Sequence, residues 1–262
     1  MRTIVLLGLL ALLACGQATA QRVNIGTEVF YNTEVAEYPQ DTTMSLWHVI
    51  LLHPSKFDVG FDLNNRITTQ ERLEQHTDWI VATNLGMFHI EPGASFSLTT
   101  SYLKHNNNVL TNHWAKGHLG ILAYNQDTVA LLRKQDYLNN PNQWTSAISL
   151  IRLVSNGQVV WSKQAKFWSA VVIGQLTDGT LLLIHSRDGY SMNKLAHLAL
   201  ERYPDLVNLY YLEGGPEASL SIRNWGDYAG SYETSYNENH ANQKQWDIPN
   251  ALYFFIKPTN VH

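Results

Sequence analysis

The sequence predicts a single α+β domain over residues 24–262, built mostly of antiparallel sheet and covered by a few helices. Three observations predict it. Short apolar runs of strand length recur along the chain, two tight-turn dipeptides join neighbouring runs, and only two segments have helical spacing. Polar, Asn-rich segments at 104–108, 137–143 and 235–245 are interpreted as loops rather than linkers, so one domain is expected.

The first strands are expected at 47–52 and 58–63, where an intervening Pro-Ser-Lys turn indicates a hairpin. Two further hairpins are expected around Asn156-Gly157 and Asp178-Gly179, because these dipeptides tolerate the positive φ angles of tight turns. The strands that flank those two turns, and two later strands, are expected at 150–154, 158–162, 170–176, 180–186, 207–212 and 252–257.

Two helices are expected between the strands. The first begins at Thr68-Thr69-Gln70-Glu71, which has the spacing of a capping box, and places Leu73 and His76 on its inner face. The second begins after Ser191, a favourable N-cap, and ends before Pro204. Its apolar residues recur at three-to-four spacing and are Leu195, Leu198 and Ala199.

Residues 1–20 are interpreted as an export signal. Arg2 precedes an apolar stretch from Ile4 to Ala14 that is too short to cross a bilayer as a helix, and Ala18-Thr19-Ala20 is a pattern that signal peptidase accepts. No later stretch approaches transmembrane length. The protein is therefore expected in the periplasm, the cell envelope or the extracellular space.

A second interpretation of the same segment is open. Leu12-Leu13-Ala14-Cys15 resembles a bacterial lipobox, in which Cys15 would carry a lipid anchor. Cys15 is the only cysteine in the chain. Under both interpretations, the folded domain has no internal disulfide and must be stabilised by its core.

Composition excludes two classes of protein. With 45% hydrophobic and 11% aromatic residues and a formal net charge of -4, the chain is not expected to be disordered. Its 18 basic residues do not exceed its 22 acidic residues, so there is no surplus of cations for binding nucleic acid.

The most informative segment is the strand from Val207, which ends in Glu213 and is followed by Gly214-Gly215. An apolar strand that ends this way places a carboxylate at the edge of a sheet, where glycines let a ligand approach and exposed amides can hold an anion. Ser219 follows closely and can point its hydroxyl at the same space. The alternative is a tight turn with a solvated glutamate.

A second strand, from Trp79, ends in the same way with Asn84 and a glycine turn at Gly86. Asn84 would either face a ligand or serve only its local backbone.

A third strand, from Leu181 through His185, ends in Arg187 just before the helix that begins at Ser191. Arg187 and the helix N-terminus together would bind a phosphate or a carboxylate. The alternative for Arg187 is a surface ion pair.

Together, these segments resemble the phosphodiester glycosidase family, which includes the enzyme that uncovers mannose 6-phosphate by removing N-acetylglucosamine. The family's first motif, Asn-x-Gly-x-Phe/Tyr, stands here as Asn84-Leu85-Gly86-Met87-Phe88, and its last, Asp-Gly-Gly followed by Ser, as Glu213-Gly214-Gly215 with Ser219. The resemblance covers about residues 79–222. This chain departs from the family at Glu213, where Asp is widespread, and at Ala170, where many relatives carry Arg.

The resemblance implies an exported hydrolase that cleaves a sugar-1-phosphodiester between the anomeric carbon and the phosphate oxygen. Its partner would be a carbohydrate or a glycan phosphodiester. Glu213 would act as base or nucleophile, Arg187 would hold the phosphate, and Asn84 would orient a sugar hydroxyl or water. The residues expected to bind substrate are Gly86, Phe88, Trp168, His185, Gly214, Gly215 and Ser219.

The alternative function is that of a non-catalytic envelope protein of the same fold that binds glycan or phosphodiester, which Ala170 favours. No cofactor is expected, and a divalent metal is left open. His113 and His118 form the only close histidine pair in the polar middle region, which is weak evidence for a metal site. The sequence lacks a Gly-x-Ser-x-Gly elbow, a phosphate-binding loop ending in Lys-Ser/Thr, and a His-Glu-x-x-His motif.

Overall fold

The structure is a computed structural model that describes residues 23–24, 29–38, 41–89, 98–163, 166–223, 226–229 and 245–257. The expected export signal, Cys15 and most of the expected loop at 235–245 lie outside these residues. What is described is an α+β arrangement dominated by antiparallel sheet, as the sequence predicts.

Two main sheets form the frame, and their described strand pairs are antiparallel. In spatial order, the large sheet contains β1 (Val23–Asn24), β2 (Val29–Tyr38), β3 (Asp41–Leu52), β15 (Leu181–Tyr190), β14 (Trp168–Leu176), β16 (Leu206–Gly214), β12 (Ser146–Ser155), β10 (Gly120–Tyr124) and β11 (Val129–Arg133). Beside this path, β13 (Gln158–Val159) and β8 (Leu103–His105) pair with β12, and β9 (Asn108–Thr111) pairs with β8.

The small sheet contains, in spatial order, β18 (Gly226–Ala229), β17 (Ser219–Ile222), β5 (Trp79–Asn84), β19 (Ala251–Ile256) and β4 (Phe57–Asp62). A separate pair is formed by β6 (Phe88–His89) and β7 (Leu98–Thr99). Strands that are far apart in the sequence are therefore neighbours in both main sheets.

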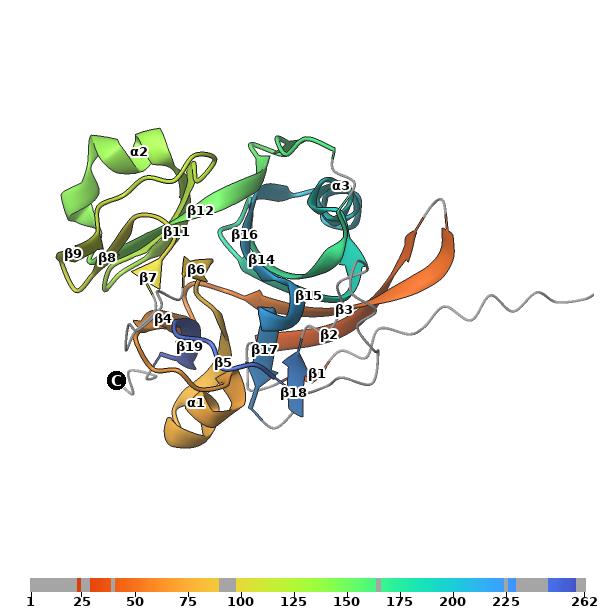
Figure 1. Ribbon diagram of the computed structural model, residues 1–262, viewed down its shortest axis with the longest axis horizontal. Helices are drawn as coiled ribbons and strands as arrows, with labels where there is room; N and C mark the ends of the chain where they lie inside the picture. The colour runs from red at the N-terminus through yellow and green to blue at the C-terminus, as the bar shows by residue number, and fades with distance from the viewer. Residues whose placement is uncertain are drawn as a thin grey trace, which may run out of the picture.

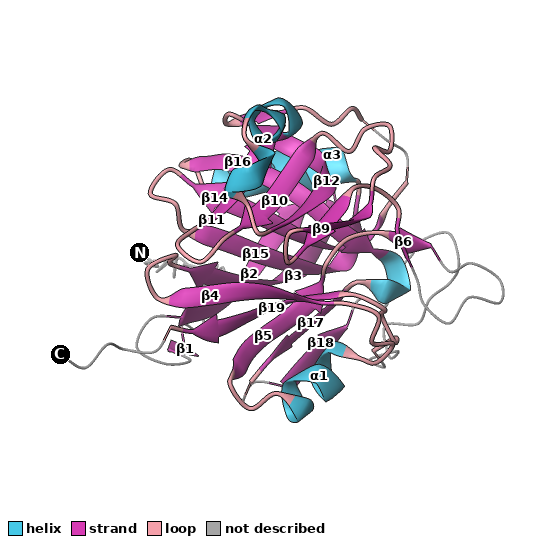
Figure 2. Cartoon of the chain, turned by 90° about the vertical axis from the view of Figure 1, so that its left-hand side faces the viewer, coloured by secondary structure: helices cyan, strands magenta, loops and turns pink. Residues whose placement is uncertain are grey.

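The two sheets pack face to face, and helices cover their outer sides (Figures 1 and 2). The main core lies between the sheets and takes side chains from both, for example Leu183 and Leu212 from the large sheet and Val81 and Phe254 from the small one. The helix α3 (Met192–Arg202) covers the far side of the large sheet, α1 (Thr69–Gln75) covers that of the small sheet, and α2 (Lys134–Asn139) packs beside β10 and β11. Because both faces are covered, the central strands carry continuous apolar runs.

Both expected glycine-containing hairpins are confirmed. β12 and β13 pair across Asn156 and Gly157, whose φ angles are 52° and 71°. β14 and β15 pair across a turn in which Gly179 has a φ of 88° and the Asp178 carboxylate accepts a 2.8 Å hydrogen bond from the Thr180 amide. Positive φ angles are what these turn residues supply.

The prediction of a hairpin between 47–52 and 58–63 is wrong, because the two strands do not pair with each other. β3 contains the first segment and pairs with β2 and β15, whereas β4 contains most of the second and pairs with β19. The turn itself is present, with a 3.0 Å hydrogen bond from the Lys56 amide to the His53 carbonyl. It carries the chain from one sheet to the other, because Leu52 and Phe57 both bury their side chains in the core between the sheets.

Both expected helices are confirmed. Thr68 and Glu71 form the capping box of α1, in which the Glu71 amide donates to the Thr68 hydroxyl at 3.1 Å and the Thr68 amide donates to the Glu71 carboxylate at 2.8 Å. Ser191 caps α3, which ends at Arg202. The sequence does not predict α2, because this helix has only 6 residues, overlaps a polar segment and buries only Tyr137.

One buried cation holds the outer part of the small sheet together. The Arg72 side chain is fully buried and pairs with Asp62 at 2.6 Å. Its guanidinium also donates to the backbone carbonyls of Asn65, Ile67 and Ile248. A single side chain therefore joins β4, the start of α1 and the segment before β19.

Replacing Arg72 with Met should lower stability sharply, because the change removes the partner of Asp62 and the donor to several buried carbonyls. We expect a loss of about 3 kcal/mol in the free energy of unfolding and a fall of about 9 °C in melting temperature, measured by thermal denaturation. Arg133→Met is the matched control: Arg133 also bonds a carboxylate, Asp136, at 2.6 Å, but both side chains are exposed. Its melting temperature should stay close to that of wild type, and equal losses in the two variants would contradict the role given to Arg72.

Candidate active site

The strand β16 leaves the large sheet at Gly214, and the chain enters the small sheet at Ser219, the first residue of β17. Between them lies a single turn of 3-10 helix, η2 (Gly215–Glu217). We call residues 213–219 the crossing turn, because they connect the two sheets (Figure 1). Several residues that the sequence singles out lie in this turn.

A β-bulge turns Glu213 toward the core between the sheets. Val171 on β14 lies opposite Glu213, but the next residue, Val172, lies opposite Tyr211, so Leu212 is an extra residue in β16. Val171 belongs to the core between the sheets, and its cross-strand neighbour Glu213 shares that face. Bulges of this kind re-aim side chains next to active sites.

Burial decides the protonation of Glu213. The residue is only 9% exposed. Burial, with a smaller contribution from the charge of Glu217, raises the pKa of the Glu213 carboxyl to about 8. The Gly214 amide, which donates to this carboxyl at 3.0 Å, acts against that rise in pKa. Glu213 is therefore mostly protonated at neutral pH.

Gly214 permits the close approach of two aromatic side chains. A Cβ atom at this position would lie 2.3 Å from the Trp168 ring and 2.3 Å from the Tyr211 hydroxyl. Trp168 is thus placed against the crossing turn. Its indole nitrogen is buried and has no hydrogen-bond partner in the part of the chain that the structure describes. A buried donor of this kind calls for an explanation, such as a bound ligand.

Asn84 ties the small sheet to the crossing turn. The residue is 1% exposed. Its side-chain nitrogen donates to the Glu217 carbonyl at 2.9 Å, and its side-chain oxygen accepts from the Ser219 amide at 2.8 Å. From the large sheet, the Ser169 hydroxyl donates to the Gly215 carbonyl at 2.8 Å. The crossing turn is held from both sheets, and the Asn84 amide is used in holding it.

His185 and Arg187 both lie on β15. His185 lies opposite Val171, which lies opposite Glu213, so His185 is two strands or about 10 Å from Glu213. It is fully buried, and its ring stacks on that of His48 with the centroids 5.9 Å apart. Arg187 follows two residues later, and its side chain lies outside what the structure describes. Contact between these two residues and a substrate stays a prediction.

Gly86 and Phe88 lie on the segment that follows β5. Gly86 has a φ of 148° and packs against β12, where a Cβ atom would lie 3.1 Å from the Ile148 and Leu150 side chains. Phe88 is half-buried on β6 and pairs with β7. Among the described residues, no hydrogen bond joins either of them to the crossing turn, so their contact with a substrate also stays a prediction.

Ala170, where the family resemblance leads us to expect Arg, is fully buried. It packs in the core that α3 covers, whereas the next residue, Val171, faces the small sheet. A charged side chain at this position would enter an apolar core, which is costly without a partner.

The crossing turn contains a second carboxyl group, that of Glu217, to which the sequence motifs assign no role. Glu217 ends η2, is partly exposed, and is close enough for its charge to raise the pKa of Glu213. The sequence feature that could have identified Glu217 is a pair of glutamates on either side of a Gly-Gly-Pro turn. Most glycoside hydrolases use a pair of carboxyl groups for catalysis. Where the surroundings of two carboxyl groups give them different pKa values, the group with the higher pKa is the candidate acid and the other is the candidate base.

Of the two histidines noted in the sequence, His113 and His118, the second has a structural role. His118 is buried, and its Nδ1 lies 3.3 Å from the Ser149 carbonyl. In the described ranges, no group of three or more His, Cys, Asp or Glu side chains is placed to hold a metal ion. Within those same ranges, no helix combines the length and the apolar character needed to cross a membrane.

Solved structures share the fold of this chain. The catalytic domain of zebrafish N-acetylglucosamine-1-phosphodiester alpha-N-acetylglucosaminidase, auto-inhibited by its pro-peptide, matches with a TM-score of 0.61 and 16% identity over 91% of this chain and 87% of that one. A hypothetical protein from Synechocystis matches with a TM-score of 0.66 and 10% identity over 91% and 64% of the two chains. A protein from Burkholderia pseudomallei K96243 that is described as exported has a TM-score of 0.51 and 9% identity over 83% and 75%. No curated protein matches the chain.

The family comparison covers the candidate site itself. A family model described as phosphodiester glycosidase matches residues 77–255. This span is more than half of the 262 residues and includes Asn84 and the whole crossing turn. The zebrafish catalytic domain has the same fold, although the identity of 16% shows the fold alone. The chain belongs to the phosphodiester glycosidase family.

Proposed function

We propose that the protein is an exported hydrolase that cleaves a sugar-1-phosphodiester at the bond between the anomeric carbon and the phosphate oxygen. Family membership supports this class of reaction, and a structural neighbour described as exported supports export. The observation that carries the proposal is the burial of Glu213 beside Glu217 in the crossing turn, which raises the pKa of the Glu213 carboxyl to about 8. N-acetylglucosamine is the first sugar to test, since the zebrafish neighbour is named for it.

The proton on Glu213 suits an anionic substrate. A phosphodiester carries a negative charge, which a charged Glu213 would repel, whereas a neutral carboxyl can approach it as a hydrogen-bond donor. We assign Glu213 as the general acid, which donates its proton to the phosphate oxygen as the bond to the anomeric carbon breaks. This role differs from the base or nucleophile expected from the sequence, because burial favours the protonated form at neutral pH.

Glu217 is the candidate for the base. In the proposed step its carboxylate takes a proton from water, and the water oxygen bonds to the anomeric carbon. The phosphate leaves with the proton of Glu213. Asn84 bonds the Glu217 carbonyl at 2.9 Å and the Ser219 amide at 2.8 Å, so we assign Asn84 as a positioning residue.

The phosphate is proposed to lie against the crossing turn, between Trp168 and Arg187. Trp168 offers a buried N–H that has no hydrogen-bond partner among the described groups. Arg187 lies on β15, the strand next to β14, and would supply the positive charge. The Gly214 amide already bonds the Glu213 carboxyl at 3.0 Å, which makes the Gly215 amide the better backbone donor.

A non-catalytic protein that binds glycan or phosphodiester is the second candidate. The buried Ala170 favours it, because the family resemblance leads us to expect a cation at that position and this chain has none there. Release of N-acetylglucosamine from an N-acetylglucosamine-1-phosphodiester by the purified protein would support the hydrolase. Binding of the same compound without any product would support the second candidate.

Glu213→Gln tests the general acid. The substitution keeps the size of the side chain and its bond to the Gly214 amide but removes the transferable proton. Turnover of an N-acetylglucosamine-1-phosphodiester should fall by at least about 10²-fold, measured as initial rates, whereas the binding of the substrate should persist. Glu201→Gln, on the exposed side of α3, is the control and should retain wild-type rates. Wild-type rates in Glu213→Gln would reject the assignment.

The raised pKa of Glu213 also predicts how stability depends on pH. Between the ordinary glutamate pKa of about 4.3 and the folded-state value of about 8, the folded protein keeps a proton that the unfolded chain has released. This contribution to stability is present at low pH and is lost as the pH rises through about 8.

Glu213→Gln removes that pH-dependent contribution. The melting temperature of the variant, relative to wild type, should therefore rise by about 12 °C between pH 5 and pH 9, measured by calorimetry across the range. The comparison needs no substrate. A difference that stays constant from pH 5 to pH 9 would show that Glu213 is ionised in the folded protein throughout.

A further inference from the structure

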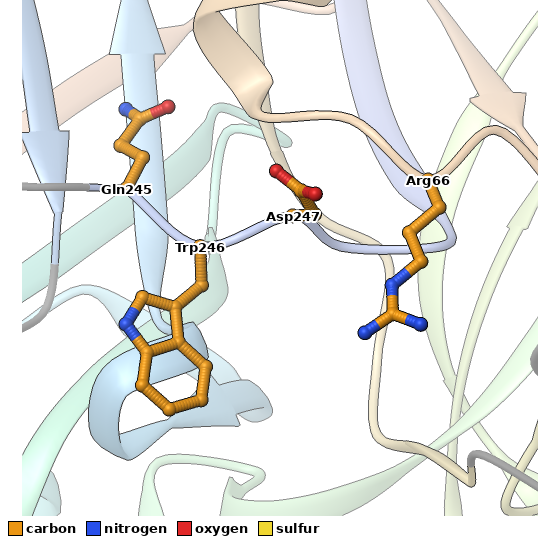
Figure 3. A pocket seen from close by; sticks show the side chains of 4 residues that line it. All are labelled: Arg66, Gln245, Trp246 and Asp247. Atoms are coloured by element: carbon orange, nitrogen blue, oxygen red, sulfur yellow. The ribbon is translucent and has the colours of Figure 1, made fainter.

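A surface pocket of about 270 Å³ lies outside the crossing turn (Figure 3). The described residues that line it are Arg66, Gln245, Trp246 and Asp247. The volume suits a ligand smaller than a typical drug molecule. Trp246 is 46% exposed, so about half of a large aromatic ring is open to solvent at this place.

Gln245 anchors one end of the segment that carries the pocket. Its side-chain oxygen accepts hydrogen bonds from the Thr69 hydroxyl at 2.9 Å and the Gln70 amide at 3.2 Å. Its side-chain nitrogen donates to the Ser221 hydroxyl at 2.8 Å. The Gln245 side chain is therefore engaged by the protein and serves as an anchor of the pocket.

Ile248 anchors the other end. It is fully buried, and its amide donates to the Ile67 carbonyl at 3.1 Å. The buried Arg72 guanidinium donates to the Ile248 carbonyl at 2.8 Å and also to the Asn65 carbonyl. The backbone on both sides of the pocket is thus held by the same buried cation.

Three exposed side chains project from this anchored backbone. Trp246 and Asp247 lie between the anchors, and Arg66 lies on the facing segment before α1. Figure 3 shows the indole of Trp246 and the guanidinium of Arg66 extending in the same direction from their segments. A backbone that is already held in place loses little further entropy when a ligand binds, which favours a binding site.

We propose that this pocket binds a neutral pyranose unit. The flat face of an indole packs well against the C–H face of a sugar ring. A sugar hydroxyl both donates and accepts hydrogen bonds, which matches an acceptor at Asp247 and a donor at Arg66. The opposite charges of these two side chains offset each other, so the pocket favours an uncharged ligand over a phosphate.

The pocket adjoins the strands that support the crossing turn. Ser221, which bonds Gln245, is two residues or about 7 Å along β17 from Ser219. Two residues after Ile248, the Asn250 carbonyl accepts a 3.3 Å hydrogen bond from the amide of Leu85, the residue after β5. We assign this pyranose as a further saccharide unit of the substrate cleaved at the crossing turn, and in this respect the inference rests on the proposed function.

The test measures binding and needs no turnover. Chitotriose, cellotriose and maltotriose serve as pyranose probes, and binding is followed by tryptophan fluorescence and calorimetry. We expect wild-type protein to bind at least one probe, Trp246→Ala to weaken that binding at least about tenfold, and Trp246→Phe, which keeps a ring, to retain part of it. Asp247→Asn should weaken it less than Trp246→Ala. Leu138→Ala, at a side chain with 44% exposure on α2, is the matched control and should bind as wild type does.

Two results would overturn the pocket assignment: no binding of any of the three probes by wild-type protein, or equal binding by wild type, Trp246→Ala and Asp247→Asn. Binding of inorganic phosphate that Arg66→Ala abolishes, without saccharide binding, would overturn it in favour of an anion site. Failure of the proposed function has a different signature, namely saccharide binding that depends on Trp246 without release of any product. Should Trp246→Ala fail to fold by thermal denaturation, Trp246→Phe and Asp247→Asn carry the same comparison.

Discussion

The candidate active site depends on the passage of the chain from the large sheet to the small sheet at Gly214 and Gly215. Trp168 and Tyr211 leave no room for a Cβ atom at Gly214, and Gly215 has a φ of 71°, which other residues rarely adopt. Because the passage is this tight, the last residues of one sheet and the first of the other lie close together. Glu213, just before the passage, is kept at the junction of the two sheets.

The same junction determines the chemistry that is available. Packing at the end of β16 excludes water from Glu213 and raises the pKa of its carboxyl to about 8. Asn84 from the small sheet and Ser169 from the large sheet hold the backbone of the crossing turn. The acid is thus protonated mainly because of where the fold places it, and a neighbouring carboxyl, Glu217, adds to the effect. Burial of this kind is a recognised way to obtain an acid that works at neutral pH.

The outer side of the small sheet is organised by a different buried charge. Arg72 bonds Asp62 and backbone carbonyls on both segments that border the Trp246 pocket. A buried guanidinium is costly unless its donors are used, and here several of them meet carbonyl oxygens. As a result, the exposed Trp246 side chain lies on a backbone that is anchored at Gln245 and Ile248, next to β17.

The sequence by itself determined the features that depend on near neighbours: the turn at Asn156-Gly157, the capping box of α1, the apolar central strands and the α+β class. It also carried the motifs around Asn84 and Glu213, which lie within the span that the family model matches. Only the tertiary structure decided that β3 and β4 lie in different sheets, that Asn84 holds a turn 135 residues away, and that burial raises the pKa of Glu213. Strand partners and pKa values are set by segments that approach from distant parts of the chain, and local sequence patterns contain no information about which segments those are.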